Sequence, residues 1–521
     1  MRAQFRGAKK LRQRDDPHFV INTIRNLSEV PLGLKLNDFP NVLVGSHASK
    51  SEILLRQFFL SFYTRICSKI IQSIGSGKSV AISLPSAWIH YLNENGVNCS
   101  TFWCQTLLYF SAFKQIAIGF AKFLYLAIQV NNPKFPSCPY VVFLGLEKNH
   151  LPVNGEKESY DIISWYKKSS IRKPNIEKIW VQAVVEKNYK SSTDLIVSRL
   201  IFPAFGSITA FFYFLFMVTF ALLVSILGVL RGKWWYGFLF SESINLHYIN
   251  ALKREYLAEE YFFNNSNWFY KPLWTYEVEK KGSLISIYYY SINIEHFQYN
   301  DYKMKEAYGN KIMLWNRFIV WDQQQMDYLK HFRKDSYYKI VGPIDFSHDS
   351  TAFKVNNTLF NIAIFDVTAF RPSCYTALGM AIAPYYSEQL IFNFLMDIED
   401  VIKGNNINLL WKQKRNVSNK FVSPGYIKKR DKIINRSYIN VEPSVSAKYI
   451  INRSDAVISM PFTSTAIIGK NNGLPSIYYD ASGKLQVKES HEILVLKSKD
   501  ELRAWFHSLN IEKIVSSPSY D

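Results

Sequence analysis

The sequence predicts an α/β protein with two Rossmann-like domains and a membrane helix inserted in the first domain. Short apolar runs alternate with helical stretches in two series, and strands alternating with helices indicate parallel sheets. A charge-free run at 200–230 interrupts the first series. A chain of 521 residues is also too long for one compact core, so we expect at least two domains.

The first series lies in residues 21–345, which we assign to an N-terminal Rossmann-like domain. Its expected strands are short apolar runs, at 42–44, 81–84, 141–144, 284–290, 313–321 and 340–342, with a helix at 322–333. A basic tail at 1–20 precedes it and lacks the apolar segment of a secretory signal. The tail is interpreted as solvated, the alternative being a tether to acidic lipid.

The second series follows a polar linker at 346–361 and fills residues 362–521, the C-terminal Rossmann-like domain. Its elements alternate regularly: strand 362–366, helix 388–402, strand 409–411, helix 446–452, strand 456–459, a helix from 463, and strand 476–479. This domain is expected to bind a ligand, because ligands of open α/β sheets lie at the carboxyl ends of the strands.

Two segments are expected at a membrane, at 105–130 and 200–230. The second is long enough to span a bilayer and is followed by Trp234, Trp235 and Tyr236, which resemble an interfacial belt. The first is an apolar helix with one polar stripe, made of Ser111, Lys114, Gln115, Lys122 and Gln129. A buried core helix is the alternative for both. The basic stretch between them favours a cytosolic body with at least one inserted helix.

The net charge of +20 implies an anionic partner. An acidic membrane surface or a phosphorylated substrate fits the apolar segments, and no nucleic-acid-binding motif is present, so a nucleic acid is the least favoured partner. The five cysteines form no CxxC pair and no metal-ligand spacing, which indicates reduced thiols.

One stretch that resembles a phosphate-binding loop does not meet the requirements of that motif. The stretch IGSGKSVAISLP at 74–85 has Gln72 where the GxxxxGK[ST] pattern needs glycine. A helical segment also precedes it and a strand-like one follows, the reverse of a phosphate-binding loop.

The stretch SMPFTSTA at 459–466 has the right order, a buried strand, a turn and a helix start. Helix N-termini expose N–H groups and the positive end of a dipole, so this loop is a candidate phosphate site. Its candidate residues are Pro461, Phe462, Thr463, Ser464 and Thr465. Plain N-capping is the alternative, but one cap needs only one hydroxyl.

Two further loops follow strands of the same domain. One offers the cations Lys412, Lys414 and Arg415, and the other offers Asp366, Thr368 and Arg371. Cations beside a helix start neutralise phosphate without a metal. No acidic pair of the DxD type is present, so neither a metal nor a cofactor is expected.

The chain resembles the polysaccharide biosynthesis PFTS-motif proteins, a bacterial family. The resemblance rests on SMPFTSTA together with five segments in the same order: FNNSNWFYKPLWTYEVEKKGS at 263–283, YYYSIN at 288–293, VWDQQQMDYL at 320–329, VGPIDF at 341–346 and LLWKQKR at 409–415. It implies surface carbohydrate synthesis by a glycosyltransferase-like protein. VGPIDF and GLPSIYYD (473–480) also resemble GT-B glycosyltransferases, including those that use CMP-linked acidic sugars.

The resemblance implies a membrane-associated, metal-independent GT-B glycosyltransferase on the cytoplasmic face of the bacterial inner membrane. Its partners would be a nucleotide-sugar donor and a lipid-linked or lipopolysaccharide acceptor. Candidate general bases are Glu259, Glu260 and Asp322, and candidate acids are His296 and His491. The alternative is a non-catalytic scaffold or polysaccharide-binding protein of the same fold.

Overall fold

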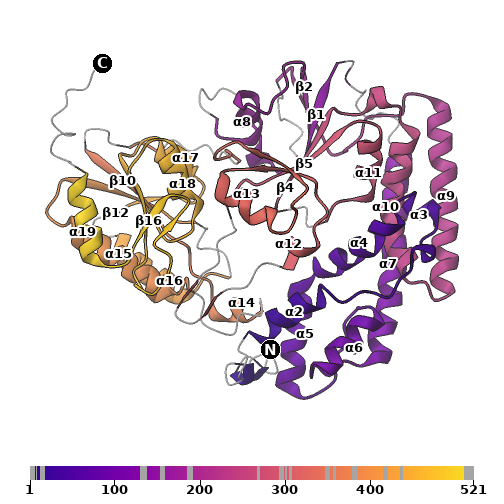
Figure 1. Cartoon of the computed structure of the whole chain (residues 1–521), viewed down its shortest axis with the longest axis horizontal. Helices are drawn as coiled ribbons and strands as arrows, with labels where there is room; N and C mark the ends of the chain where they lie inside the picture. Colours follow the sequence, from indigo (N-terminus) through magenta and orange to yellow (C-terminus); the bar gives the residue numbers. More distant parts are fainter. Residues whose placement is uncertain are drawn as a thin grey trace.

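The computed structural model describes residues 6–7, 9–11, 18–128, 136, 138–152, 159–184, 192–266, 270–292, 298–299, 302–303, 308–346, 353–355, 359–377, 385–414, 421–434 and 438–509. Most of the tail at 1–20, most of the linker at 346–361, and the candidates His296 and Arg415 lie outside the described residues. Two α/β domains and a group of long helices make up the described part (Figure 1).

The N-terminal domain is built on a seven-stranded, fully parallel sheet in the order β3-β2-β1-β4-β5-β8-β9. Its strands are β1 (Tyr140–Leu146), β2 (Lys178–Ala183), β3 (Leu195–Ser198), β4 (Glu260–Asn264), β5 (Leu284–Tyr288), β8 (Arg317–Val320) and β9 (Tyr337–Ile340). The central strands are almost entirely buried, as expected of a parallel sheet covered on both faces. A two-stranded hairpin, β6 (Gln298–Tyr299) and β7 (Tyr302–Lys303), lies outside the sheet.

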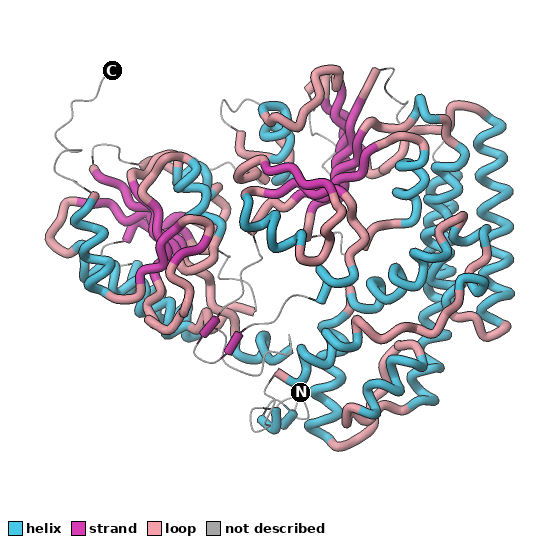
Figure 2. Tube along the Cα trace, viewed as in Figure 1, coloured by secondary structure: helices cyan, strands magenta, loops and turns pink. Residues whose placement is uncertain are grey.

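Helices surround this sheet and extend beyond it. They are α2 (Phe19–Leu27), α3 (Asn41–Val44), α4 (Ala48–Leu60), α5 (Tyr63–Ser76), α6 (Ser86–Glu94), α7 (Thr101–Ile128), α8 (Ile162–Lys168), α9 (Ile208–Leu230), α10 (Trp235–Ala251), α11 (Leu273–Lys280), α12 (Tyr308–Ile312) and α13 (Gln323–Lys330), with 3₁₀ turns at Leu36–Asp38, Lys148–His150 and Arg254–Tyr256. Figure 2 shows that the region around α7 and α9 consists of helices joined by loops.

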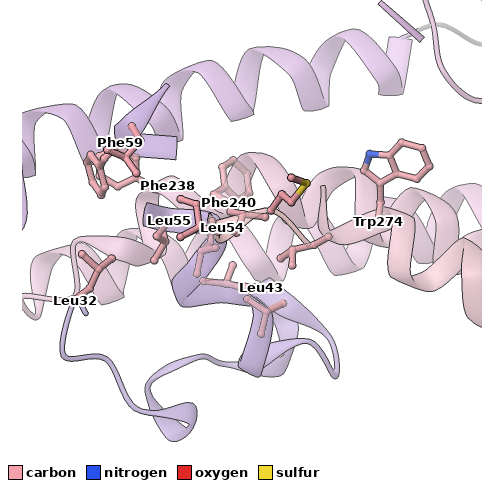
Figure 3. Close-up of a cluster of buried hydrophobic side chains, with 14 of the residues drawn as sticks. Leu32, Leu43, Leu54, Leu55, Phe59, Phe238, Phe240 and Trp274 are labelled. Atoms are coloured by element: carbon pink, nitrogen blue, oxygen red, sulfur yellow. The ribbon is translucent and has the colours of Figure 1, made fainter. Parts of the chain in front are cut away.

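Helix α10 is the centre of the helical region, because most of its residues are buried. Phe59 of α4 packs its ring 5.1 Å from that of Phe238 on α10, and Leu54 and Leu55 belong to the same core (Figure 3). Gly237 lets α7 approach closely, since a Cβ there would lie 2.6 Å from the Ala112 carbonyl oxygen. Helix α10 therefore joins α7 and α9 to the rest of the domain.

The C-terminal domain repeats the order of the first five strands and differs in the last two. Its sheet has the order β12-β11-β10-β13-β14-β16-β15, parallel except for the β15–β16 pair. The strands are β10 (Phe360–Phe365), β11 (Ile407–Lys412), β12 (Tyr438–Val441), β13 (Ala456–Ser459), β14 (Ser476–Tyr479), β15 (Glu489–Ser490) and β16 (Ile493–Leu496). The helices are α14 (Pro372–Ala377), α15 (Glu388–Ile402), α16 (Pro424–Ile434), α17 (Ala447–Ile451), α18 (Ser464–Asn471) and α19 (Lys499–Ser508).

One apolar cluster continues from the first domain into the second. Ile292 and Trp321, which follow strands of the N-terminal sheet, share it with Ile467 of α18 and Tyr478 of β14. Burial of apolar side chains is the main favourable contribution to such contacts. Helix α18 therefore packs against both its own sheet and the loops of the neighbouring domain.

The prediction of two Rossmann-like domains is confirmed, but some predicted elements are wrong. Residues 42–44 lie in helix α3, and 81–84 form no strand, since only Val80 makes an isolated bridge, to Cys99. Residues 313–316 precede β8 without regular structure. The sequence prediction missed β2, β3, β4, β12 and β16, as well as α10. The rejected GSGKS loop is the end of α5, where Gly77 adopts a left-handed conformation typical of a C-cap.

Two helices, α7 and α9, are long and apolar enough to cross a membrane. About a third or less of the most apolar part of each is buried in the protein. The polar stripe predicted on the first is not a surface stripe. Lys122 Nζ donates to the Ser241 carbonyl of α10 at 3.1 Å, and the Ser111 hydroxyl bonds to that of Ser83. Lys114 is exposed, and Gln129 lies outside the described residues.

Candidate functional site

The strand order of the C-terminal sheet reverses between β10 and β13, because β11 and β12 lie on one side of β10 and β13 and β14 on the other. Ligands of doubly wound sheets bind at the carboxyl ends of the strands at such a switch point. The loop after β10 begins with Asp366, and the loop after β13 contains the PFTS residues 461–464. Two of the loops predicted from the sequence therefore lie next to each other at this position.

The PFTS loop has a strained backbone. Phe462 has φ of 63°, in the left-handed region that aromatic residues rarely adopt. Its ring packs 5.9 Å from the ring of Tyr478, and Tyr386 donates a hydrogen bond to the carbonyl of the buried Pro461 at 2.8 Å. Strain of this kind concentrates at functional sites and is maintained by the surrounding structure.

The hydroxyl groups of the motif form hydrogen bonds to different parts of the protein. Those of Ser459, Thr465 and Thr463 form a hydrogen-bonded row that ends at the Met460 carbonyl. Thr463 occupies the N-cap position of α18, but its side chain does not cap the helix. Ser464 Oγ instead accepts a hydrogen bond from the backbone N–H of Ile292, 3.3 Å away in the N-terminal domain. The motif thus lies at the domain boundary, and its hydroxyls leave the first-turn N–H groups of α18 uncapped.

Asp366 is a buried carboxyl at the end of β10. Its Oδ2 accepts a hydrogen bond of 2.5 Å from the Tyr426 hydroxyl. Burial raises its pKa to about 6, although the Tyr426 hydrogen bond opposes the shift. Asp366 therefore positions the loop and changes charge near pH 6.

The predicted cations are not gathered at one point. Lys412 is buried and donates to the Pro443 carbonyl at 3.0 Å, which fixes the loop after β12. Lys414 is exposed. Arg371 is exposed as well, and its Nε donates to the Val422 carbonyl at 3.1 Å. Of the predicted site cations that the structure describes, Lys414 and Arg371 are exposed to solvent and Lys412 is not.

Sequence reasoning missed a set of tyrosines at this edge. Tyr385 donates to Asp480, Tyr386 to Pro461, Tyr426 to Asp366 and Tyr478 to the Thr463 carbonyl. They come from three separate segments, the loop before α15, α16 and β14, so no local spacing could have identified them as a set. Each holds a loop at the carboxyl edge of the sheet.

The candidate base Asp322 lies at the contact between the domains. It caps α13, accepting from the Gln325 N–H at 2.9 Å, and its other oxygen accepts from His491 Nδ1 at 2.6 Å. The His491 backbone N–H also donates to the Gln324 side chain. Burial opposes ionisation of Asp322, but these hydrogen bonds lower its pKa overall. Asp322 and His491, both chosen from the sequence, therefore meet across the boundary.

The other two candidate bases lie elsewhere. Glu260 is the first residue of β4 and Glu259 precedes it, so both are at the amino edge of the N-terminal sheet. Glu259 pairs with Arg254 at 2.9 Å, and the buried Glu260 pairs with Arg317 at 3.2 Å. The structure does not bring them to the PFTS loop.

The N-terminal sheet has its own switch point, between β1 and β4. Phe346, at the end of VGPIDF, stacks on Tyr290 with ring centroids 4.0 Å apart and contacts the ring of His150 at the same distance. The Ser266 hydroxyl bonds to that of Tyr290. We call these four residues the aromatic cluster. Tyr290 lies two residues before Ile292, so the cluster neighbours the PFTS loop.

His150 is neutral at pH 7, because burial lowers its pKa to about 4. Its Nδ1 accepts the Glu147 N–H at 2.9 Å, which leaves the proton on Nε2. The ring is therefore a hydrogen-bond donor rather than a base in this state. Among the described residues, no group of three or more His, Cys, Asp or Glu side chains has the geometry of a metal site.

The polysaccharide biosynthesis PFTS motif protein family matches residues 213–506. The chain belongs to this family. The match runs from α9 to α19 and includes both switch-point loops of the C-terminal domain. The resemblance inferred from the motifs is thereby confirmed, and the tandem of two Rossmann-like domains is the architecture of a GT-B glycosyltransferase.

Solved structures with a similar fold have very different sequences. They include a mutant of Staphylococcus aureus TarM in complex with fondaparinux, α-GlcNAc-glycerol and UDP, with 11% identity, a TM-score of 0.30 and 53% of each chain covered. The S. aureus MnaA–UDP structure has 8% identity and a TM-score of 0.31, with 73% of this chain and 89% of that one covered. A trehalose-6-phosphate protein of Escherichia coli bound with UDP-2-fluoro glucose has 9% identity and a TM-score of 0.32, with 71% and 91% covered. No curated protein matches the sequence.

Proposed function

We propose that this protein is a metal-independent glycosyltransferase that transfers a sugar from a nucleotide donor to a lipid-linked or lipopolysaccharide acceptor during synthesis of a bacterial surface polysaccharide such as capsule or O-antigen. The observation that carries the proposal is the position of the PFTS motif. The signature of a polysaccharide biosynthesis family lies at the switch point of the C-terminal sheet and on the boundary with the second domain.

The donor phosphates would bind at the start of α18. Uncapped N–H groups of the first turn and the helix dipole favour an anion there. Lys414 and Arg371 are exposed on neighbouring loops, and Arg415 follows Lys414 in the sequence. In the transfer, the acceptor hydroxyl oxygen forms a bond to the anomeric carbon, and the bond from that carbon to phosphate breaks. The nucleoside phosphate leaves with the electron pair, and these groups would stabilise its charge.

The acceptor would bind to the N-terminal domain. The aromatic cluster offers ring faces and the Nε2–H of neutral His150 beside the PFTS loop. Sugars bind to such combinations through apolar CH faces and hydrogen bonds. The apolar helices α7 and α9 and the net charge of +20 support a location at the cytoplasmic face of the inner membrane, where an acceptor with a lipid tail would be found.

Nucleotide binding tests the donor site. We expect one of CMP, UDP and GDP to raise the melting temperature, and Ser464→Ala and Thr463→Val to reduce that shift strongly. Ser498→Ala is the matched control, because Ser498 caps α19 of the same domain through its side chain. It should lower the melting temperature without changing the nucleotide shift. The absence of any shift with all three nucleotides would disprove the donor site.

A non-catalytic scaffold or polysaccharide-binding protein is the second candidate. It is favoured by one observation, that the hydroxyls of Thr463, Ser464 and Thr465 already have partners within the protein. Incubating membranes that contain the protein with a panel of sugar nucleotides separates the two. Release of nucleotide that depends on Ser464 supports the transferase, whereas glycan binding without any turnover supports the scaffold.

A further inference from the structure

Helices α7 and α9 share a large exposed apolar surface. On α7 the side chains of Phe102, Phe110 and Ile128 are 70%, 70% and 75% exposed, and on α9 those of Phe212, Phe216 and Leu230 are 60%, 68% and 68% exposed. Exposed residues recur along each helix on the side away from α10. We call this surface the α7–α9 face. Contiguous apolar surfaces of this extent mark protein or membrane contacts.

The two helices are antiparallel neighbours. Tyr109, near the start of α7, donates to the Gly232 carbonyl beyond the end of α9 at 2.7 Å. Phe123, near the end of α7, packs 5.8 Å from Phe214, near the start of α9. Their exposed sides therefore form one continuous surface rather than two separate stripes.

The charge of the surrounding chain selects an anionic partner. Neither residues 95–146 nor residues 195–241 contain an aspartate or a glutamate. The exposed cation Arg199 lies nine residues before the start of α9, the exposed Arg231 is the C-cap of α9, and Lys114 is exposed on α7. An apolar surface on segments that carry cations and no carboxylates matches a bilayer with acidic headgroups. A protein partner would need a surface that is both apolar and acidic, which is a more specific requirement than an anionic bilayer.

The packing of α10 determines how the face meets the bilayer. Helix α10 contacts α9 at both ends, through Tyr236 at Gly228 and through Tyr248 at Phe214. On another side it contacts α11, which carries Glu277, Glu279 and Lys280. If α9, about 35 Å long, stood across a bilayer of about 30 Å, α10 and the charged α11 would lie at the same depth. Charged side chains are costly there.

We propose that the α7–α9 face is an in-plane membrane-docking surface, which sinks into one leaflet of an anionic bilayer while neither helix crosses it. The inference deepens the membrane association proposed above and does not depend on the donor chemistry. Both ends of α9 then lie on the same side of the membrane, with Arg199 and Arg231 at headgroup level. The carboxyl edges of the two sheets remain in water next to the lipid surface.

Vesicle flotation of the full chain tests the docking. The wild type should float with vesicles of phosphatidylcholine and phosphatidylglycerol and much less with phosphatidylcholine alone. The double substitution Phe110→Glu and Phe216→Glu should lower the bound fraction at least tenfold. Leu494→Glu is the matched control, since Leu494 is 54% exposed on β16 of the other domain, and it should bind as the wild type does. Equal binding by the double variant would overturn the proposal.

The orientation has its own test, which needs no substitution. Trypsin added outside vesicles that carry the bound protein should cut after both Arg199 and Arg231, as identified by mass spectrometry. A spanning helix would protect one of the two sites, and that result would overturn the in-plane arrangement. Labelling of Arg199→Cys and Arg231→Cys by a membrane-impermeant maleimide, in a background without the native cysteines, gives the same distinction.

A second copy of the chain is the other occupant that the experiments detect. In that case, sedimentation without vesicles would show a dimer that the double substitution converts to monomer, and the wild type would not float. That result would overturn membrane docking. Nucleotide protection measured on the same double variant separates the two proposals, because it should be unchanged even where vesicle binding is lost.

Discussion

The two domains share the order of their first five strands but place different chemistry at their switch points. At the N-terminal switch point, the ring of Phe346 stacks on that of Tyr290 and contacts the tilted ring of His150. At the C-terminal one, the equivalent position holds a strained turn, a row of hydroxyls and a helix start. The same scaffold thus offers ring faces on one side and backbone N–H groups on the other. Because ligands of open α/β sheets lie at the carboxyl ends of the strands, the sheet sets the position of each candidate site and the loop residues set its chemistry.

The largest expected effect concerns whether the two domains unfold as one cooperative unit. Ile467 of α18 is buried in the cluster shared by both domains, so Ile467→Ala should cost about 2–5 kcal/mol of unfolding free energy and uncouple the domains. Ile450→Ala, in a cluster confined to the C-terminal domain, is the control. Urea denaturation should show two transitions only for the first variant. A single transition in both would mean that the Ile467 side chain is not what couples the two domains.

The next largest effect on the free energy of unfolding is expected from the hydrogen bond between Asp322 and His491, which joins the two domains. Asp322→Asn replaces a carboxylate that accepts from His491, and hydrogen bonds to charged groups contribute about 1.5–3 kcal/mol. The folded-state pKa of Asp322 is lowered, so its stabilisation is present above the ordinary value of 3.8 and is lost as the pH falls below it. Urea denaturation at several pH values should show the two proteins converging in acid. A constant difference would exclude this link.

A smaller effect, on the pH dependence of stability, is expected from Asp366 at the C-terminal switch point. The pKa of Asp366 is raised from 3.8 to about 6, so folding favours its protonated form. Its contribution is complete below pH 3.8 and is lost as the pH rises through 6. Asp366→Asn should flatten this decline and be about 1–3 kcal/mol more stable than the wild type at pH 7. A variant less stable than the wild type at pH 7 would show that the carboxylate is needed in its charged form.

The smallest effect concerns the strained turn. Phe462→Gly relieves the left-handed backbone, whereas Phe462→Ala keeps the strain and loses the packing on Tyr478. Because a side chain in that conformation costs roughly 1 kcal/mol, the glycine variant should be the more stable by about that amount. Thermal unfolding of both variants provides the measurement. Equal stability would indicate that the turn relaxes when the ring is removed.

Sequence reasoning located the C-terminal domain well because its strands are short, fully apolar runs separated by helices. Strands β10, β11, β13 and β14 lie within two residues of their predicted positions, and Thr463 is the N-cap of a helix as expected. It failed on β4, which reads EYFFN without an alternating pattern, and on 42–44, an apolar run too short to distinguish strand from helix. Periodicity carries no information over three or four residues.

The sequence by itself determined the fold class, the family signature and the strand, turn and helix order of the PFTS motif, because these are local or follow from burial patterns. Only the tertiary structure decided which polar groups meet. It joined Asp322 to His491, tied Ser464 to Ile292, and left Glu259 and Glu260 at the opposite edge of their sheet. It also fixed α7 and α9 along α10, with their apolar sides outward. These outcomes depend on contacts between residues far apart in the chain, which no local pattern encodes.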